Sequence, residues 1–168
     1  ALACFKAQAA VLAEENPDIF IIETIFDINI ACTAIQAIRS VTDIPVACTM
    51  TFKETPKGFF TIFGNAPDQS MKALVDEGAS MVGANCAMGS DTMITLADQI
   101  RKAVDVPVIA SHRINTPQTA RQILMQDCCD MVAMGRSLIA DPMLPQKANS
   151  GREHEIVHCI ACAQGCFD

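Results

Sequence analysis

The sequence predicts an α/β protein whose core is a parallel sheet, with short buried strands alternating with amphipathic helices. Three observations support this fold class. Five short apolar runs recur about 25 to 35 residues apart, the spacing of successive βα units. The segments between them have helical periodicity and recognisable helix ends. Of the 168 residues, 51% are hydrophobic and 18% are charged, which suits one domain with a sizeable core.

The five apolar runs are short and partly β-branched, as expected of strands that are buried on both faces. They cover residues 19–23 (IFIIE), 44–50 (IPVACTM), 80–86 (SMVGANC), 106–111 (VPVIAS) and 130–134 (DMVAM).

Helices are expected before the first strand and between successive strands. They begin near Ala3, Asp27, Asn65, Ser90 and Thr116, and Pro67 and Pro117 suit the first turns of the third and fifth. Apolar positions at helical spacing, Ile30, Met93 and Leu124 among them, are expected to face the core.

Five parallel βα units fit two architectures. One is five of the eight units of a TIM barrel, and the other is a complete five-stranded doubly wound sheet. A helix at the start and cysteines at the end favour the partial barrel. We therefore expect a single partial (β/α) barrel domain over residues 1–158 and a cysteine-rich C-terminal tail over residues 159–168.

Charge and composition limit the partners. A net charge of −7 argues against nucleic acid and anionic membranes, and no apolar run reaches the length of a membrane span. The nine cysteines lack the framework of a small secreted domain, which favours a reducing cytoplasm. We expect a small-molecule substrate, and self-association through the open edges of an incomplete barrel.

Chemistry in either architecture belongs at the C-terminal ends of the strands. The candidates there are Glu23, Thr24, residues 49–53, Asn85, Cys86, His112, Arg113, Gly135 and Arg136. The long connection over residues 51–66 is expected to form a lid or a substrate wall on the same side.

Each candidate has a functional and a structural interpretation. A thiolate at Cys86 can bind zinc, but a lone cysteine is more often a packing residue. Arg113, Gly135 and Arg136 can bind a phosphate. The alternative is that Gly135 only permits a turn and that both arginines are solvated. Glu23 can hold an ammonium group or act as a base, or else form an ion pair at the rim.

Three closely spaced cysteines, Cys159, Cys162 and Cys166, form a C-x2-C-x3-C run that suits an iron–sulfur cluster or zinc. No fourth cysteine follows them in the sequence. The adjacent Cys128 and Cys129 precede the last strand, so they are expected at the opposite end of the sheet from the chemistry.

Residues 1 to about 105 resemble the homocysteine S-methyltransferase family, which includes the homocysteine-binding barrel of cobalamin-dependent methionine synthase. The resemblance rests on IFIIETIFD (19–27), PVACTMTF (45–52), KGFFTIFGNAPDQ (57–69) and DEGASMVGANCAMGSDTM (76–93). It implies a zinc barrel in which Cys86 is a metal ligand and Glu23, with Thr24 and Asn85 nearby, binds the amino acid. The family's other two zinc ligands, a Cys-Cys pair in a glycine-rich setting, have no counterpart here.

Residues 106–168 resemble a second family, the old-yellow-enzyme superfamily that includes 2,4-dienoyl-CoA reductase and trimethylamine dehydrogenase. The motifs are PVIASHRINTPQTA (107–120), DMVAMGRSLIADPMLPQKANSGR (130–152) and CIACAQGC (159–166). This resemblance implies that Arg113, Gly135 and Arg136 contact an FMN phosphate. It also implies that Cys159, Cys162 and Cys166 are three of four ligands to a [4Fe–4S] cluster.

The two resemblances meet in register near residue 106, so the chain is interpreted as a chimera that carries barrel strands 4 to 8. The favoured function is zinc-dependent methyl transfer to a thiol such as homocysteine. One alternative is a fragment of an FMN and iron–sulfur ene-reductase or dehydrogenase. The other is a scaffold without catalytic activity.

Overall fold

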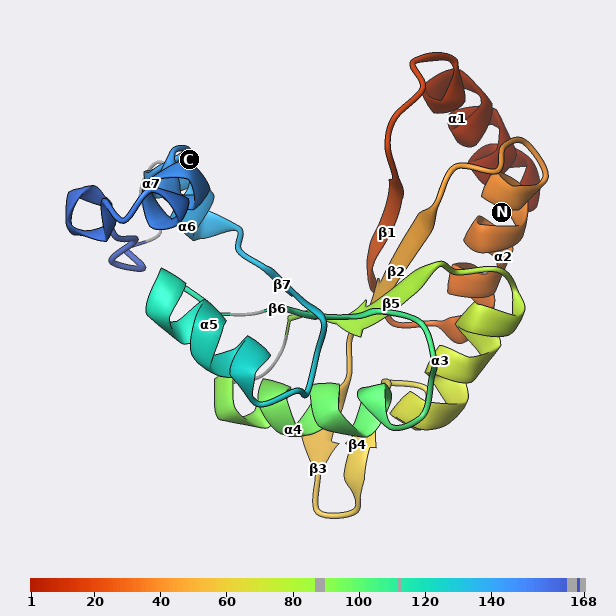
Figure 1. Ribbon diagram of the computed structural model, residues 1–168. Helices are drawn as coiled ribbons and strands as arrows, with labels where there is room; N and C mark the ends of the chain where they lie inside the picture. Colours follow the sequence, from red (N-terminus) through yellow and green to blue (C-terminus); the bar gives the residue numbers. More distant parts are fainter. Residues whose placement is uncertain (87–89, 112, 163–165, 167–168) are drawn as a thin grey trace.

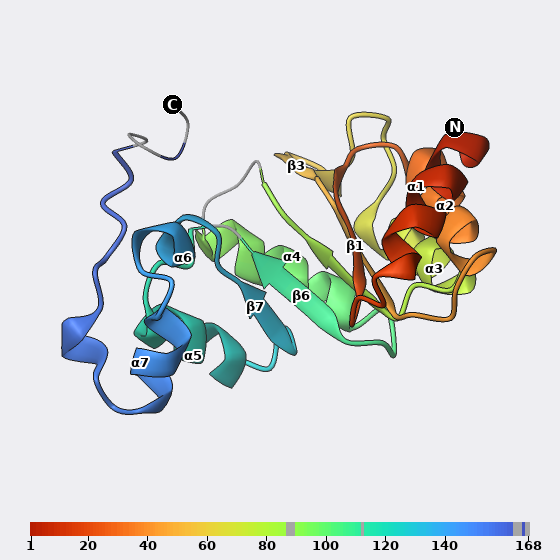
Figure 2. The same ribbon diagram turned by 90° about the horizontal axis from the view of Figure 1, so that it is seen from above.

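The computed structural model describes residues 1–86, 90–111, 113–162 and 166. A five-stranded parallel sheet forms its centre, and the strands lie side by side in their order along the chain (Figure 1, Figure 2). These strands are β1 (Phe20–Ile25), β2 (Val46–Met50), β5 (Met81–Ala84), β6 (Val108–Ser111) and β7 (Met131–Ala133).

The strand order decides between the two expected architectures. A doubly wound sheet reverses its strand order at a switch point, whereas a barrel wall adds each strand beside the one before it. Here the order is β1-β2-β5-β6-β7 without reversal, and the main helices lie on the convex side of a curved sheet (Figure 1). The partial barrel is therefore confirmed.

The five helices expected from the sequence are present, and two short ones that were not expected, α6 and α7, follow β7. They are α1 (Leu2–Glu14), α2 (Ile28–Arg39), α3 (Pro67–Asp76), α4 (Ser90–Arg101), α5 (Pro117–Met125), α6 (Arg136–Ala140) and α7 (Leu144–Asn149). Asp27 caps α2 by accepting a hydrogen bond from Asn29 N at 2.8 Å, and Thr116 caps α5 by accepting one from Thr119 N at 3.1 Å. Such caps satisfy amide groups that the first helical turn leaves free.

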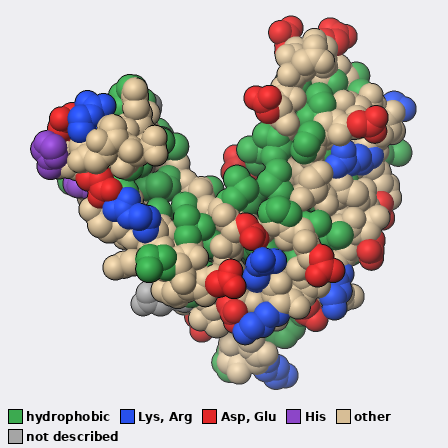
Figure 3. Space-filling view, viewed as in Figure 1, with side chains coloured by type: hydrophobic (Ala, Val, Ile, Leu, Met, Phe, Trp, Pro, Cys, Tyr) green, Lys and Arg blue, Asp and Glu red, His purple; other side chains and the backbone are tan. Residues whose placement is uncertain are grey.

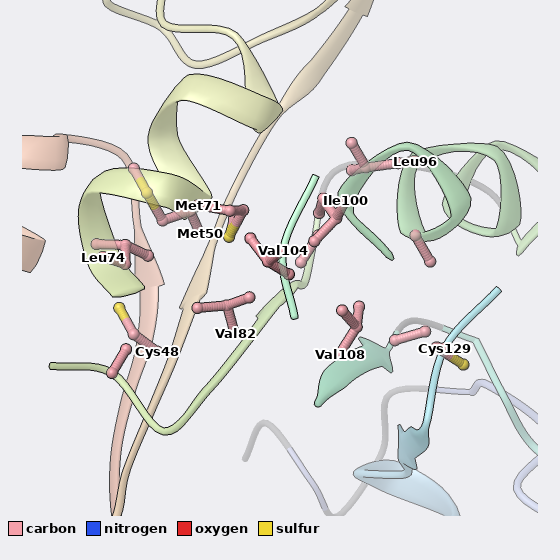
Figure 4. Packing of buried hydrophobic residues seen from close by; sticks show 14 of the residues in the cluster. Cys48, Met50, Met71, Leu74, Val82, Leu96, Ile100, Val104, Val108 and Cys129 are labelled. Atoms are coloured by element: carbon pink, nitrogen blue, oxygen red, sulfur yellow. The ribbon is translucent and has the colours of Figure 1, made fainter. Parts of the chain in front are cut away.

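The core lies between the sheet and the helices rather than inside the curve of the sheet. Cys48 and Met50 of β2, Val82 of β5 and Val108 of β6 are fully buried against helical side chains (Figure 4). The helical side of the core includes Met71, Leu74, Leu96 and Ile100. One continuous apolar layer therefore holds the strand ends in place.

The concave face of the sheet is open. In the space-filling view, hydrophobic side chains line both sides of a deep hollow (Figure 3). On the edge strands, the side chains of Ile21 in β1 and Met131 in β7 are 65% and 47% exposed. In the described sheet β1 and β7 are the outer strands, and an open sheet edge can pair with another polypeptide.

Three expectations need correction. Residues 51–66 contain an antiparallel hairpin, β3 (Lys53–Thr55) and β4 (Gly58–Phe60), where a loop was expected. Ile30 is exposed, because Ala31 rather than Ile30 faces the core at the start of α2. Leu124, near the end of α5, is also exposed.

Beyond β7, the chain forms α6, α7 and a short 3-10 turn (Glu153–Glu155) before the tail. The side chain of Asp141 links these segments through hydrogen bonds. Its carboxylate accepts hydrogen bonds from Lys147 Nζ at 2.7 Å and from the amide groups of Met143 and Val157, both at 3.0 Å.

Among the described helices, none is both long and apolar enough to cross a membrane.

Candidate functional site

A cavity of about 360 Å³ opens where β1, β5, β6 and β7 end. This is the side of the sheet at which parallel α/β folds place their chemistry. Its walls are formed by Glu23, Thr24, Asn85, Cys86, Ser111, Arg113, Ile114, Asn115, Ala133, Met134, Gly135 and Arg136. We call it the strand-end pocket.

The first wall of the pocket comes from β1 and β5. The pairing of β1 with β2 shifts register between Ile22 and Ile25, so the intervening Glu23 and Thr24 form a bulge. Thr24 takes a left-handed φ of 61° there. The bulge brings both residues to the pocket.

Asn85 is fixed by neighbours on both sides of its amide. Its Nδ2 donates a hydrogen bond to Thr24 Oγ1 at 2.7 Å, and its Oδ1 accepts a longer one from Thr51 Oγ1 at 3.5 Å. Asn85 is also buried. Because both polar ends of the amide are occupied, Asn85 serves to position β1 against β5.

Cys86 follows directly, with its thiol side chain exposed in the wall of the pocket. Its φ is 60°, a left-handed backbone conformation that residues other than glycine rarely adopt. The next part of its motif, residues 87–89, lies outside the described residues.

The second wall comes from the segments that follow β6 and β7. Arg113, at a φ of 53°, and the buried Ile114 turn the chain after β6. Ser137, at the start of α6, is buried and donates from Oγ to Ile114 O at 3.3 Å. This contact holds the segments after β6 and β7 together. His112, also a candidate, lies outside the described residues.

Backbone strain is concentrated at this pocket. Among the described residues other than glycine, six have positive φ, and Thr24, Cys86 and Arg113 are three of them. Two of the others, Asn16 and Asp127, belong to residue types that tolerate this conformation. A left-handed residue costs about 1–3 kcal/mol, and such residues cluster at binding and catalytic sites.

The pocket brings together most of the predicted residues that follow the strands, but residues 49–53, which follow β2, do not line it. Glu23, Thr24, Asn85 and Cys86 face Arg113, Gly135 and Arg136 across one cavity. Sequence reasoning missed Ser111 and Asn115. Each lies two positions from Arg113, which had already been placed on this side of the sheet. The hairpin over residues 53–60 does not line the cavity.

The described residues do not fit a complete zinc site. No group of three or more His, Cys, Asp and Glu among them could hold a metal ion. Cys86 is the only thiol in the pocket wall within the part of the chain that the structure describes. The buried Cys128 and Cys129 precede β7, at the opposite end of the sheet, as expected. Burial and, after it, the adjacent Cys128 raise the pKa of the Cys129 thiol to about 12.

The tail cysteines Cys159, Cys162 and Cys166 do not form a metal-binding group among the described residues either. Cys162 is exposed and the other two are partly exposed. They do not line the strand-end pocket.

Comparison with known proteins identifies the family. The model of the homocysteine S-methyltransferase family matches residues 1–139, well over half of the chain. The chain belongs to the homocysteine S-methyltransferase family. A relative with this activity in its name, the S-methylmethionine–homocysteine S-methyltransferase of Pongo abelii, is 28% identical over 113 residues, covering 67% of this chain and 30% of that protein.

This member of the methyltransferase family also resembles oxidoreductases. A metal reductase of Desulforamulus reducens is 53% identical over 73 residues, which is 44% of this chain and 11% of the reductase. The chain thus spans about a tenth of the length of that relative. The mixed resemblance expected from the sequence is confirmed.

A solved structure shows the same fold over almost the whole chain. The 6-hydroxypseudooxynicotine amine oxidase of Pseudomonas geniculata N1 superimposes with a TM-score of 0.75 at 16% sequence identity. The match covers 96% of this chain and 30% of the oxidase. At this identity the likeness supports the fold alone.

Proposed function

We propose that the chain binds homocysteine, or a closely related thiol amino acid, in the strand-end pocket and presents its sulfur for methyl transfer. The observation that carries the proposal is the convergence of Glu23 and Cys86, from strands separated by β2, in one cavity. Family membership supplies the reaction class.

The side chains of the first wall suit an amino acid. Glu23 has no ion-pair or hydrogen-bond partner among the described residues, so its carboxylate is free to receive a substrate ammonium group. Thr24 and Asn85 hold the bulge that carries Glu23 in one conformation. Preorganisation of this kind lowers the entropy lost on binding.

The transfer itself is a displacement at carbon. A thiol loses its proton to solvent, its sulfur forms the new bond to the methyl carbon, and a sulfonium donor leaves as a neutral thioether. Thiolate is the nucleophilic form of the substrate sulfur.

The direct test is a binding and turnover experiment on the purified chain. Homocysteine is titrated calorimetrically, and methionine formed from an S-methyl sulfonium donor is measured by mass spectrometry. Glu23→Gln is expected to weaken homocysteine binding about tenfold or more, since a charged hydrogen bond is lost. The matched control is Glu15→Gln, at the end of α1 and remote from the pocket. Equal binding by both variants would contradict the proposal.

A second candidate function is flavin-dependent oxidoreduction, favoured by the second wall. Arg113 and Arg136 are unpaired among the described residues, and a Cβ placed on Gly135 meets nothing within 4 Å. These three residues fit the phosphate end of FMN, which when bound would supply hydride or electron transfer. Tighter binding of FMN than of riboflavin, measured by flavin fluorescence, would support this candidate, because riboflavin lacks the phosphate.

A further inference from the structure

The arginines of this chain divide into two groups. Outside the strand-end pocket, each one has a partner: Arg39 donates to the Gly78 and Ile44 carbonyls, and Arg101, Arg121 and Arg152 pair with carboxylates. Within the described residues, Arg113 and Arg136 have none, and both line the pocket. The two arginines without a hydrogen-bond or ion-pair partner in the described structure therefore line the same cavity.

The position of Arg113 is maintained against local strain. Its φ of 53° lies in the region that favours glycine, yet the residue beside it, Ile114, is buried in the protein. The turn at Arg113 thus sends Ile114 inward and leaves the guanidinium at the pocket. A strained residue without a packing role for its side chain indicates a function for that side chain.

The opposite wall carries the complementary charge. Among the described residues, Glu23 is the only carboxylate in the wall of the pocket, and it lies on β1, at the far edge of the sheet from β7. A cavity of about 360 Å³ falls at the lower end of the size range for small-molecule sites. It suits a compact ligand that carries both a cationic and an anionic group.

We propose that Arg113 and Arg136 form a carboxylate subsite that, together with Glu23, holds the two charged groups on the α-carbon of an amino acid and makes the pocket selective for the zwitterion. This inference rests on the proposed function and adds the residues that select the substrate. Arginine binds a carboxylate through two parallel hydrogen bonds, which fixes orientation as well as affinity. Because the described part of the pocket wall offers one thiol, too few for a metal site, these charges are proposed to anchor the ligand.

The test uses L-methionine, the product of homocysteine methylation, as a calorimetric probe of the full chain with a metal chelator present. Two analogues separate its charged ends: 3-(methylthio)propylamine lacks the carboxylate, and N-acetyl-L-methionine lacks the ammonium group. Arg113→Gln and Arg136→Gln are each expected to weaken L-methionine binding about tenfold or more and to leave the amine unchanged. Glu23→Gln is expected to weaken L-methionine and the amine but not N-acetyl-L-methionine.

Three further variants separate binding from folding. Arg121→Gln removes a surface arginine of α5 and should leave all affinities unchanged. Arg113→Lys keeps the charge and should retain part of the affinity. Arg113→Gly relieves the left-handed backbone, so it should keep or raise the thermal midpoint while it abolishes the preference for L-methionine over the amine.

Several results would overturn the subsite. If Arg113→Gln weakened L-methionine and the amine equally, the guanidinium would not contact the carboxylate. If both arginines were needed for FMN or inorganic phosphate but not for L-methionine, the anion would be a phosphate. If L-methionine binding depended on Glu23 but on neither arginine, the proposed function would stand and only this inference would fail. If neither homocysteine nor L-methionine bound the wild-type chain, both would fail.

Discussion

The part of the sheet formed by β1, β2 and β5 differs from the part formed by β6 and β7 in how deeply its strands are buried. All five residues of β2 are buried, and the Thr24–Asn85 hydrogen bond closes the first wall of the pocket. In β7, by contrast, Met131 and Ala133 are exposed. The first part is tightly packed around β2, although Ile21 of its edge strand β1 is exposed, and the second part is more open to solvent at β7.

This difference assigns separate roles to the two walls. A rigid wall with occupied hydrogen-bonding groups can set the position of a ligand, and a wall with free charges can supply its affinity. Glu23 rests on the rigid wall, while Arg113 and Arg136 lie on the open one. A ligand bridging the walls would satisfy charges that the chain itself leaves free.

The junction between the two parts depends on Gly83. A Cβ at this position would overlap the Ile109 carbonyl oxygen and lie 2.9 Å from its carbon, so β5 and β6 can pair only with glycine here. Gly83→Ala is expected to lower the free energy of unfolding by about 3 kcal/mol, measured by urea denaturation. Gly135→Ala, where a Cβ meets nothing, is the control and should cost about 1 kcal/mol or less. Equal losses of stability in the two variants would show that β5 and β6 can shift to make room for the added Cβ.

Two arginines test the difference in packing directly. Arg39 makes four hydrogen bonds of 2.7–2.9 Å to Gly78, Ile44 and Ser80, which tie the end of α2 to the starts of β2 and β5. Arg101 makes a partly exposed ion pair with Asp130 at 3.3 Å. Arg39→Met should therefore cost about 2 kcal/mol and Arg101→Met less than about 1 kcal/mol in urea denaturation. The reverse order would refute the comparison.

The open edges predict self-association. Ile21 lies on the edge strand β1, and Val11 lies on helix α1 with the same 65% exposure. A lysine on an edge strand blocks strand pairing, so Ile21→Lys should weaken self-association about tenfold, measured by analytical ultracentrifugation. Val11→Lys, which leaves the edge intact, should have little effect. A wild-type chain that stayed monomeric at all concentrations would contradict this prediction.

The smallest expected effect concerns the segment after β7. Hydrogen bonds from Lys147 and then from Val157 N hold the pKa of Asp141 below its ordinary value of 3.8. A lowered pKa means that the stabilisation is complete above the ordinary value and is lost as the pH falls through the folded-state pKa. Asp141→Asn should therefore speed amide hydrogen exchange near Val157 at pH 7 and make it less dependent on pH below 4. Unchanged exchange at pH 7 would exclude this role.

The sequence predicted the fold closely because buried parallel strands are nearly continuous apolar runs. The run over residues 44–50, for example, contains β2 (Val46–Met50). The β3–β4 hairpin was missed because its strands are three residues long and KET is polar. Ile30 was misplaced because periodicity does not show how far the first turn of a helix projects beyond the core.

The site was predicted less completely than the fold. The rule that chemistry follows parallel strands located Glu23, Cys86 and Arg113, and the structure gathers them in one pocket. The strained backbone at Thr24, Cys86 and Arg113 could not be foreseen, because it arises from tertiary packing that forces a conformation against local preference. The absence of partners for Arg113 likewise depends on the folded surroundings.

The central claim is that the wall from β1 and β5 and the wall from the segments after β6 and β7 form one binding site. Nuclear magnetic resonance of the ¹⁵N-labelled chain during titration with L-methionine tests it most directly. The amide signals of Thr24 and Cys86 on the first wall, and of Arg113 and Gly135 on the second, should shift together with a single dissociation constant. Shifts confined to one wall, or different constants for the two walls, would contradict the claim.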